Sequence, residues 1–242
     1  MGIHSVRGAL RQAGGGVEEV WLEHRRRDRR LAELVELARG AGVRVRQVEP
    51  RAIEAAAPGL NHQGALAWVS IAVSRGEPNL DAILDNLAVP PFLLILDEIQ
   101  DPHNLGACLR TADAAGIQAV IAPRDQAVGL TPTVSKVASG AAETIPFVQV
   151  TNLARTLDAL KSRGIWIVGL AGEAEIDLYG IDLKGPLALV LGSEGRGLRR
   201  LTRERCDFLA RLPMLGTVES LNVSVATGVC LYEALRQRRG GE

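Results

Sequence analysis

From residue 91 onward, short apolar runs of strand length alternate with segments of helical period. The apolar runs lie at 92–96, 119–122, 147–150, 166–170, 187–191 and 208–212. A parallel pair of strands needs a long crossover connection, which a helix usually supplies. The alternation therefore predicts an α/β domain over 91–242, in which helices cover both faces of a parallel sheet.

The first 75 residues carry a second, smaller α/β pattern. Helical periods at 4–13, 28–39 and 51–57 alternate with strand patterns at 17–23, 43–48 and 65–73. Glycine and proline then interrupt the chain near 76–78 and again at 90–91. A chain of 242 residues is long enough for two small domains. We expect domains at 1–75 and 91–242, joined by a linker at 76–90 that holds a short helix near 80–87.

Composition excludes several classes of protein. Hydrophobic residues make up 47% of the chain, yet no apolar run reaches the roughly 18 residues of a membrane span, so we expect no membrane segment. The N-terminus has no apolar signal region. Three scattered cysteines without a Cys-x-x-Cys pair indicate reduced thiols in a cytoplasmic protein. The four histidines never occur at metal-ligand spacing, so we also expect no metal.

The charge is neutral overall but uneven along the chain. Basic and acidic residues each number 28. Residues 1–51 nevertheless hold eleven arginines against seven acidic residues, and Arg25 and Arg26 begin the dense run 25–30. Arginine binds phosphate with a planar fork, so this run and a second at 196–211 are candidates for RNA contact. The alternative is a general preference for arginine, since only three of the 28 basic residues are lysine.

The segment 212–226, LPMLGTVESLNVSVA, combines a strand end, a loop and a helix start. Its first residues continue a strand, Gly216 lies in the loop, and an apolar helix follows to about Arg238. Ser220 has the side chain of a good helix N-cap. A helix start leaves backbone N–H groups unpaired, so the loop and the helix start together could hold a polar ligand.

Three segments occur in the order that marks one enzyme family. They are 104–112 (NLGACLRTA), 189–198 (LVLGSEGRGL) and 212–226. Together they resemble the motifs of the SpoU family of RNA ribose 2′-O-methyltransferases, and 2–6 and 62–64 resemble its small substrate-binding domain. The resemblance implies a trefoil knot in the C-terminal domain, S-adenosylmethionine (SAM) as methyl donor, a homodimer and an RNA substrate. The extra N-terminal domain favours a guanosine of 23S rRNA over tRNA.

The same resemblance assigns residues to the methyl donor. A donor site needs an apolar slot and loops whose backbone lies close to the ligand. The family positions that contact SAM correspond to Gly192, Leu212 and Leu221, and the expected pocket walls are Met214 and Leu170. Without the motifs, Leu212 and Leu221 would be interpreted as ordinary core residues.

The resemblance also assigns catalytic roles, to Arg110, Asn104, Glu194, Ser220 and Asn222. Arg110 would assist removal of the ribose 2′ proton. Arginine has a pKa above 12 and is a poor base, so orienting the hydroxyl or stabilising an alkoxide is the easier role. Glu194 would position the substrate or accept a proton through water. From the residues alone, Asn104 could instead cap its helix, and Arg110 could be a surface cation.

Three other polar residues are weaker candidates. Asn61 and His62 are candidates for RNA contact in the N-terminal domain. His103, beside the expected start of a helix, could act as a general base, although a lone histidine at such a place is more often structural.

Two other classes of protein are disfavoured by the sequence, and two stay open. A Rossmann-type enzyme is disfavoured because residues 192–197 read G-x-x-G-x-G instead of G-x-G-x-x-G and occur late in the chain. A serine hydrolase based on Ser193 fails because no histidine follows His103. A tRNA ribose methyltransferase and a non-catalytic RNA-binding protein stay open, and SAM binding would separate the second of these from an enzyme.

Overall fold

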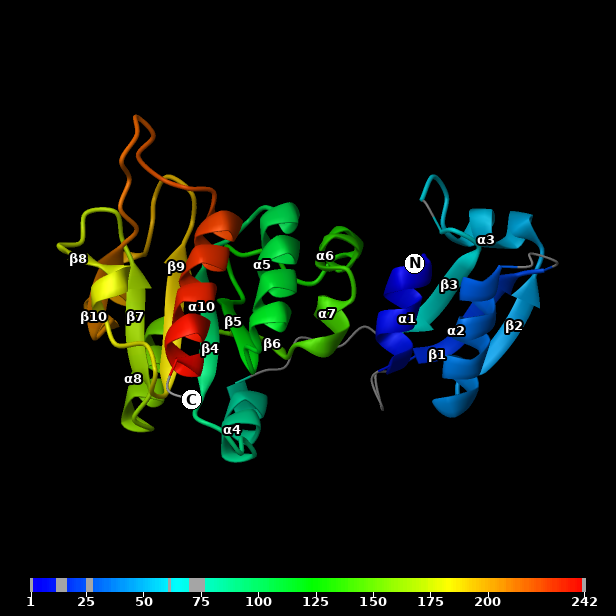
Figure 1. The fold of residues 1–242 in the computed structure, drawn as a ribbon, viewed down its shortest axis with the longest axis horizontal. Coiled ribbons are helices and arrows are strands. Elements are labelled where there is room, and N and C mark those ends of the chain that lie inside the picture. The colour runs from blue at the N-terminus through cyan, green and yellow to red at the C-terminus, as the bar shows by residue number, and fades with distance from the viewer. Residues whose placement is uncertain (1, 12–16, 25–27, 61, 70–76, 241–242) are drawn as a thin grey trace. The chain divides into compact units, whose positions relative to one another are not determined.

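The computed structural model describes residues 2–11, 17–24, 28–60, 62–69 and 77–240. The chain divides into two compact units (Figure 1). Unit 1 comprises Met1–Val73 and Ser139–Thr144, and unit 2 comprises Ser74–Ala138 and Ile145–Glu242. Both units mix helices and strands, which confirms the predicted α/β class. The exact boundaries at 75 and 91 stay a prediction.

Unit 1 has a three-stranded sheet with helices on both faces. Its elements are α1 (Ile3–Arg11), β1 (Val17–Glu23), α2 (Arg29–Gly40), β2 (Arg44–Val48), α3 (Pro50–Ala56) and β3 (Ala65–Val69). The central strand β1 runs parallel to β2 and antiparallel to β3. Val20 and Leu22 of β1 face α1 and α2, whereas Leu66 of β3 faces α3. This division follows from the two-residue period of a strand.

Local chemistry accounts for the element ends in unit 1. Helix α2 begins after Asp28, whose Oδ1 accepts a 2.9 Å hydrogen bond from the Arg30 backbone N–H. A capping carboxylate at this position satisfies one of the unpaired N–H groups of the first turn. Strand β3 ends at Val69 in the structure, and the predicted continuation to 73 lies outside the described residues.

Unit 2 is built on a sheet of seven parallel strands. They are β4 (Phe92–Asp97), β5 (Ala119–Pro123), β6 (Phe147–Val150), β7 (Trp166–Leu170), β8 (Ile176–Asp177), β9 (Leu187–Gly192) and β10 (Phe208–Arg211). Their order in the sheet is β6-β5-β4-β9-β7-β10-β8. Every recorded pairing in this sheet is parallel, as the alternating pattern predicts.

Helices cover both faces of this sheet. They are α4 (Glu77–Asp85), α5 (Pro102–Ala115), α6 (Pro132–Ala138), α8 (Leu153–Ser162), α9 (Arg200–Arg205) and α10 (Val223–Arg239), with a 3₁₀ turn at Leu178–Gly180. The short helix α7 (Ala141–Thr144) belongs to unit 1. Helices α5 and α10 pack side by side (Figure 1). On the opposite face, α8 buries Leu153, Leu157 and Leu160 against the strands. Leu80 and Leu84 of α4 join the same core, so the helical part of the expected linker packs within unit 2.

The strand order reverses its direction between β4 and β9. These two strands are neighbours with matched register, and Asp97 lies opposite Gly192. The chain leaves β4 through α5 toward β5 on one side, and it leaves β9 through α9 toward β10 on the other. Such a switch point opens a crevice beyond the carboxyl ends of the strands, where ligands bind in open α/β sheets.

The start of α10 differs from the sequence prediction. Asn222, and not Ser220, is the N-cap: its Oδ1 accepts from the Ser224 backbone N–H over 2.9 Å. Both side chains have suitable chemistry for a cap, so local propensity does not choose between them. Residues 212–222 form an extended loop in the structure, and the helix begins two residues later than expected.

Candidate active site

Three side chains from distant segments meet at the switch point. Asn104 lies in the first turn of α5, Glu194 follows β9, and Asn222 caps α10. The Nδ2 groups of Asn104 and Asn222 donate to the same oxygen, Glu194 Oε1, over 3.0 and 2.7 Å. Asn222 Nδ2 also donates to Asn104 Oδ1 over 3.0 Å. Each residue belongs to a different one of the three sequence motifs, so the structure brings three of the expected catalytic residues together.

Asn104 is available for this cluster because another residue caps its helix. Asp101 is the N-cap of α5, and its Oδ1 accepts a 2.8 Å hydrogen bond from the His103 backbone N–H. That bond is the main reason why the pKa of Asp101 lies below its usual value. The exposed His103 ring has its Nδ1 at 3.2 Å from the same oxygen. The capping role considered for Asn104 is therefore wrong.

Asn222 performs two tasks with one side chain. Its Oδ1 accepts hydrogen bonds from the backbone N–H and the Oγ of Ser224, over 2.9 and 2.6 Å. Its amide nitrogen meanwhile holds Glu194. Because the cap fixes the orientation of the amide, the start of α10 sets the position of the Glu194 carboxylate.

A cavity of about 370 Å³ opens beside the cluster. Its lining residues come from the segment after β4, the segment after β9 and the first turn of α10: Glu98, Ile99, Gln100, Asp101, Asn104, Ser193, Glu194, Arg196 and Val223. The lining is mostly polar, and Arg196 is its single basic residue. The cavity is large enough for a nucleoside-sized ligand, which suits a site for one RNA nucleotide.

A buried ion pair links the end of β4, next to the cavity-lining Glu98, to the segment before α9. The Asp97 side chain is 0% exposed, and its Oδ1 lies 2.7 Å from both Nε and Nη2 of Arg199. Its second oxygen accepts the Arg199 backbone N–H over 3.0 Å. Arg199 Nη1 lies 3.3 Å from Glu98, which has a φ of +62°. No sequence motif pointed to this pair, although a carboxylate that ends a buried apolar strand is a signal for such a role.

Three of the expected donor-binding residues lie at the ends of neighbouring strands. Leu170 ends β7, Gly192 ends β9, and Leu212 directly follows β10. These strands are adjacent and parallel, so their carboxyl ends lie at one edge of the sheet. Met214 and Leu221 follow on the loop 212–222, where Leu221 is 36% exposed. The arrangement offers an apolar surface beside backbone at strand ends, which fits an adenosyl group.

Gly192 has a reason to be glycine that the motif alone does not reveal. A Cβ at this position would lie 2.1 Å from the Gly197 carbonyl carbon and 2.5 Å from the Leu198 nitrogen. The loop after β9 closes on its own strand there, as the Ser193–Gly197 bridge also indicates. The missing side chain therefore makes room for the chain's own backbone.

Two expected catalytic residues lie apart from the amide–carboxylate cluster. Arg110 is exposed on α5 and forms no hydrogen bond or ion pair with the described residues. It follows Asn104 by six positions, which in a helix corresponds to about 9 Å along the axis and about 240° of rotation. The two side chains consequently point to different sides of α5. Ser220 is exposed on the loop before α10.

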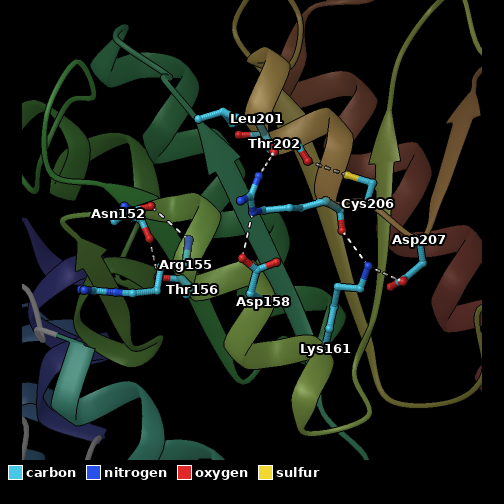
Figure 2. A network of polar contacts seen from close by, with 10 residues as sticks. Asn152, Arg155, Thr156, Asp158, Lys161, Leu201, Thr202, Cys206 and Asp207 are labelled. Atoms are coloured by element: carbon cyan, nitrogen blue, oxygen red, sulfur yellow. Dashed lines mark hydrogen bonds and ion pairs between the residues drawn. The ribbon is translucent and has the colours of Figure 1, made fainter.

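The arginine run 196–211 is mostly engaged in ion pairs within unit 2. The pairs are Arg199 with Asp97 and Glu98, Arg200 with Glu204, Arg203 with Glu173, Arg205 with Asp158 and Arg211 with Asp177. Side chains also connect α9 to α8: Arg205 Nε donates to Asp158 Oδ2 over 2.9 Å, and Lys161 Nζ donates to the Arg205 carbonyl. Lys161 also pairs with Asp207, as Figure 2 shows. Within the described part of the chain, Arg196 is the arginine of this run without an ion pair. The run as a whole therefore serves structure more than phosphate display.

Of the four N-terminal candidates for RNA contact, the structure describes one, His62. Arg25, Arg26 and Asn61 lie outside the described residues. His62 is half-buried; its Nε2 lies 3.3 Å from Glu54 Oε2, and its Nδ1 accepts from the Gly64 backbone N–H over 3.1 Å. Its ring thus holds a turn together in the structure, and its contact with RNA stays a prediction.

Comparison with known proteins places the chain in a family. Residues 91–232 match the SpoU rRNA Methylase family, and residues 1–72 match the family described as RNA 2'-O ribose methyltransferase substrate binding. The chain belongs to the SpoU rRNA methylase family, and it is an RNA 2′-O-ribose methyltransferase by membership. The fold, the switch-point site and the order of the three motifs agree with this family.

Individual relatives extend over nearly the whole chain. The protein named 23S rRNA (guanosine-2'-O-)-methyltransferase RlmB of Pseudomonas syringae pv. tomato is 57% identical over 98% of this chain and 94% of its own length. Its counterpart of the same name in Ralstonia nicotianae is 54% identical over 98% and 95%. Among solved structures, the SpoU methyltransferase AviRb from Streptomyces viridochromogenes, in complex with AdoMet, is 25% identical with a TM-score of 0.81, and covers 100% of this chain and 90% of that one.

No described helix combines the length and the apolar character that crossing a membrane requires. Likewise, no three His, Cys, Asp or Glu side chains in the described ranges are grouped as a metal site would require. The expectation that the protein uses no metal stays a prediction.

Proposed function

We propose that this protein transfers the methyl group of SAM to the ribose 2′ hydroxyl of a guanosine in 23S rRNA. The observation that carries the proposal is the convergence of Asn104 and Asn222 on one oxygen of Glu194, at the edge of a nucleoside-sized cavity. The names of the relatives that are more than 50% identical over nearly all of the chain support the choice of substrate.

Glu194 is suited to act on a ribose hydroxyl. Both amides bind its Oε1, and no described residue binds its Oε2. A carboxylate oxygen that is held in place and left free can accept the hydroxyl proton, directly or through one water. Asn104 and Asn222 would keep the carboxylate in position, which is an orienting role that costs no rearrangement during the reaction.

The donor would lie at the ends of β7, β9 and β10. SAM, when bound, supplies the electrophilic methyl group. Leu170, Leu212, Met214 and Leu221 would contact its adenosyl group, while the tight turn at Gly192 keeps the loop after β9 out of the way. The crystal structure of AviRb with AdoMet supports this choice of donor. We also propose that the segments 192–198 and 212–222 form the trefoil knot, since β9 is inserted between the earlier strands β4 and β7.

We further propose a homodimer in the cytoplasm. On α10, Val225 is 53% exposed and Tyr232 is 51% exposed, and with the half-buried Val229 they form a stripe at helical spacing. Val223 and Leu231 of the same helix are buried inside unit 2 and are not part of this stripe. The unpaired Arg110 on the adjacent helix α5 would then reach the cavity of the partner subunit, which explains its distance from Asn104.

Methylation of RNA by matched variants tests the reaction. The full chain, labelled SAM and an unmodified 23S rRNA transcript should give 2′-O-methylguanosine at one position, mapped by mass spectrometry. Glu194→Gln should lower the rate at least about a hundredfold, since a positioned proton acceptor contributes 10²–10⁴. Glu204→Gln, at an exposed carboxylate of the nearby α9, is the control and should stay active. Methylation of tRNA and not of the rRNA transcript would favour the tRNA alternative, and SAM binding without any transfer would favour the non-catalytic one.

Complementation tests the shared site. Arg110→Ala and Glu194→Gln proteins should each be inactive. If Arg110 serves the partner subunit, mixed dimers contain one intact site, and an exchanged mixture should regain about a quarter of wild-type activity. An inactive mixture that has demonstrably exchanged subunits would place Arg110 in the site of its own subunit.

A further inference from the structure

One face of the sheet in unit 1 is covered over only part of its area. Helix α3 packs Ile53 and Ala57 against Leu66, with Val48, Leu60 and Trp21 at the margin. The strand register places two rows across the same face: Arg44–Glu19–Trp68, and then Arg46–Trp21–Leu66. The first row lies farther from the α3 contacts, and its Trp68 is 44% exposed. A large aromatic side chain is thus left at the surface of a small unit.

The two tryptophans of this face form one rigid element. Their ring centroids lie 5.4 Å apart at an interplanar angle of 69°, an edge-to-face arrangement. The Trp21 Nε1–H donates a 2.6 Å hydrogen bond to Glu19 Oε2, which satisfies the indole and fixes its orientation. Trp21 therefore holds the ring of Trp68 in place by contact with it. Because the exposed ring is already ordered, it loses little conformational entropy when a ligand binds.

Two arginines beside the aromatic pair are not neutralised by ion pairs. The guanidinium carbon of Arg46 lies 5.6 Å from the centroid of the Trp21 ring, within cation–π distance. Arg44 is exposed one row away. Neither guanidinium group forms an ion pair with the residues that the structure describes. In the arginine run of unit 2, by contrast, most of the guanidinium groups bind carboxylates.

We propose that this surface, the tryptophan platform of Trp21, Trp68, Arg44 and Arg46, binds a single-stranded segment of the substrate RNA. An unpaired base stacks on Trp68, and the two guanidinium groups contact the adjacent phosphates. Exposed aromatic rings beside free cations match the two components of single-stranded nucleic acid, its base faces and its backbone charge. The inference rests on the proposed function, because it assigns part of the RNA contact to unit 1.

Variants of the full-length protein separate stacking from charge. In filter binding with an unmodified 23S rRNA transcript, Trp68→Ala should weaken binding roughly tenfold, within the range of one base–aromatic stack. Its dependence on salt should stay that of the wild type, since no cation is removed. Trp68→Phe should retain most of the affinity. The Arg44→Ala, Arg46→Ala double variant should instead lower the log–log salt slope by about two.

Trp166 provides a matched control in unit 2. It is 54% exposed and also contacts another aromatic ring, Phe208, with a centroid distance of 5.6 Å. Trp166→Ala should bind the transcript like the wild type, because no arginine among the described residues makes a cation–π contact with the Trp166 ring.

Three results would overturn the platform in different ways. If Trp68→Ala bound the transcript as tightly as wild type while the wild type still methylated it, the platform would be wrong and the proposed function would stand. A change in oligomeric mass or melting temperature for Trp68→Phe and Trp68→Ala, with RNA affinity unchanged, would assign the surface to a protein contact. If the wild type bound no RNA at all, both the platform and the proposed function would fail.

Discussion

Arg199 and Asp97 stand 102 positions apart in the chain, yet the Arg199 backbone and side chain both bind the buried Asp97 carboxylate. Arg199 follows the loop that carries Glu194, and Asp97 ends the strand before the segment that carries Asn104. The pair therefore joins the two segments that carry the site. Glu194 itself is held by the two amides, and the ion pair fixes the chain that leads into and out of its loop.

Asp97→Asn should destabilise the protein and slow methyl transfer together. Loss of a buried ion-pair partner usually costs about 3–5 kcal/mol, and we expect about 2 kcal/mol here because Arg199 is 39% exposed. Urea unfolding measures the free energy. The transfer rate should fall about tenfold with SAM affinity unchanged, because the carboxylate of Glu194 would be less well placed. Glu204→Gln, which breaks the exposed Arg200–Glu204 pair, should cost less than about 0.5 kcal/mol.

Arg196→Ala should weaken RNA binding without affecting the donor. Arg196 lines the cavity and has no ion pair in the described part of the chain, so its guanidinium is available to a phosphate. The salt slope of binding should fall by about one, and KM for RNA should rise several-fold. Arg200→Ala removes a neighbouring exposed arginine that already pairs with Glu204, and it should leave the slope unchanged. Equal effects of the two substitutions would contradict a specific role for Arg196.

Gly192→Ala should displace the loop after β9. The added Cβ would overlap backbone atoms of Gly197 and Leu198, and overpacking against backbone costs about 1–3 kcal/mol or more. Calorimetry should show both a lower melting temperature and weaker SAM binding. Gly172→Ala is the control, because a Cβ there would meet nothing within 4 Å. A Gly192→Ala protein as stable as the control would show that the loop adapts.

The three cysteines should resist thiol reagents in the folded protein. Burial raises the pKa of Cys108 to about 11, and those of Cys206 and Cys230 to about 12. At pH 8 the thiolate fraction of each is then very small, whereas unfolded thiols titrate near pH 8.5. A disulfide reagent should therefore react only after denaturant is added. Rapid reaction without denaturant would indicate that these thiols are accessible.

The same shifts predict how stability changes in alkali. Each folded thiol has a raised pKa, so its contribution to stability is complete below about pH 8.5. That contribution is lost as the pH rises toward 11 for Cys108 and toward 12 for Cys206 and Cys230. The free energy of unfolding in urea should fall between pH 8.5 and 11. Cys108→Ser should reduce this fall, and an unchanged profile would assign it to other groups.

The strands of unit 2 were predictable because each is a continuous apolar run. Strand β4 was predicted at 92–96 and ends one residue later, at Asp97. The prediction was accurate because a strand that is buried on both faces consists almost entirely of apolar residues. The two-residue strand β8 was missed, because Ile176 and Asp177 are too few to form a pattern. The start of α10 was misplaced because both Ser220 and Asn222 are suitable caps, and a contact with Glu194 is made only by the second.

The site itself was predictable as residues and not as geometry. The motifs named Asn104, Glu194 and Asn222 separately, but their meeting at one oxygen depends on the strand order. The Asp97–Arg199 pair escaped for the same reason, since no local pattern links positions so far apart. The arginine run 196–211 had the opposite outcome. Its density suggested phosphate binding, and the acidic partners that neutralise most of it lie elsewhere in the sequence.

The amide–carboxylate cluster takes one residue from the first helix after β4, one from the loop after β9 and one from the cap of the last helix. It cannot form until that last helix has docked beside α5. During synthesis, a chain that still lacks residues 223–239 would contain Asn222 but no helix to hold it against Asn104 and Glu194. Methylating activity should therefore appear in a growing chain only after residues 223–239 have been added and have docked beside α5.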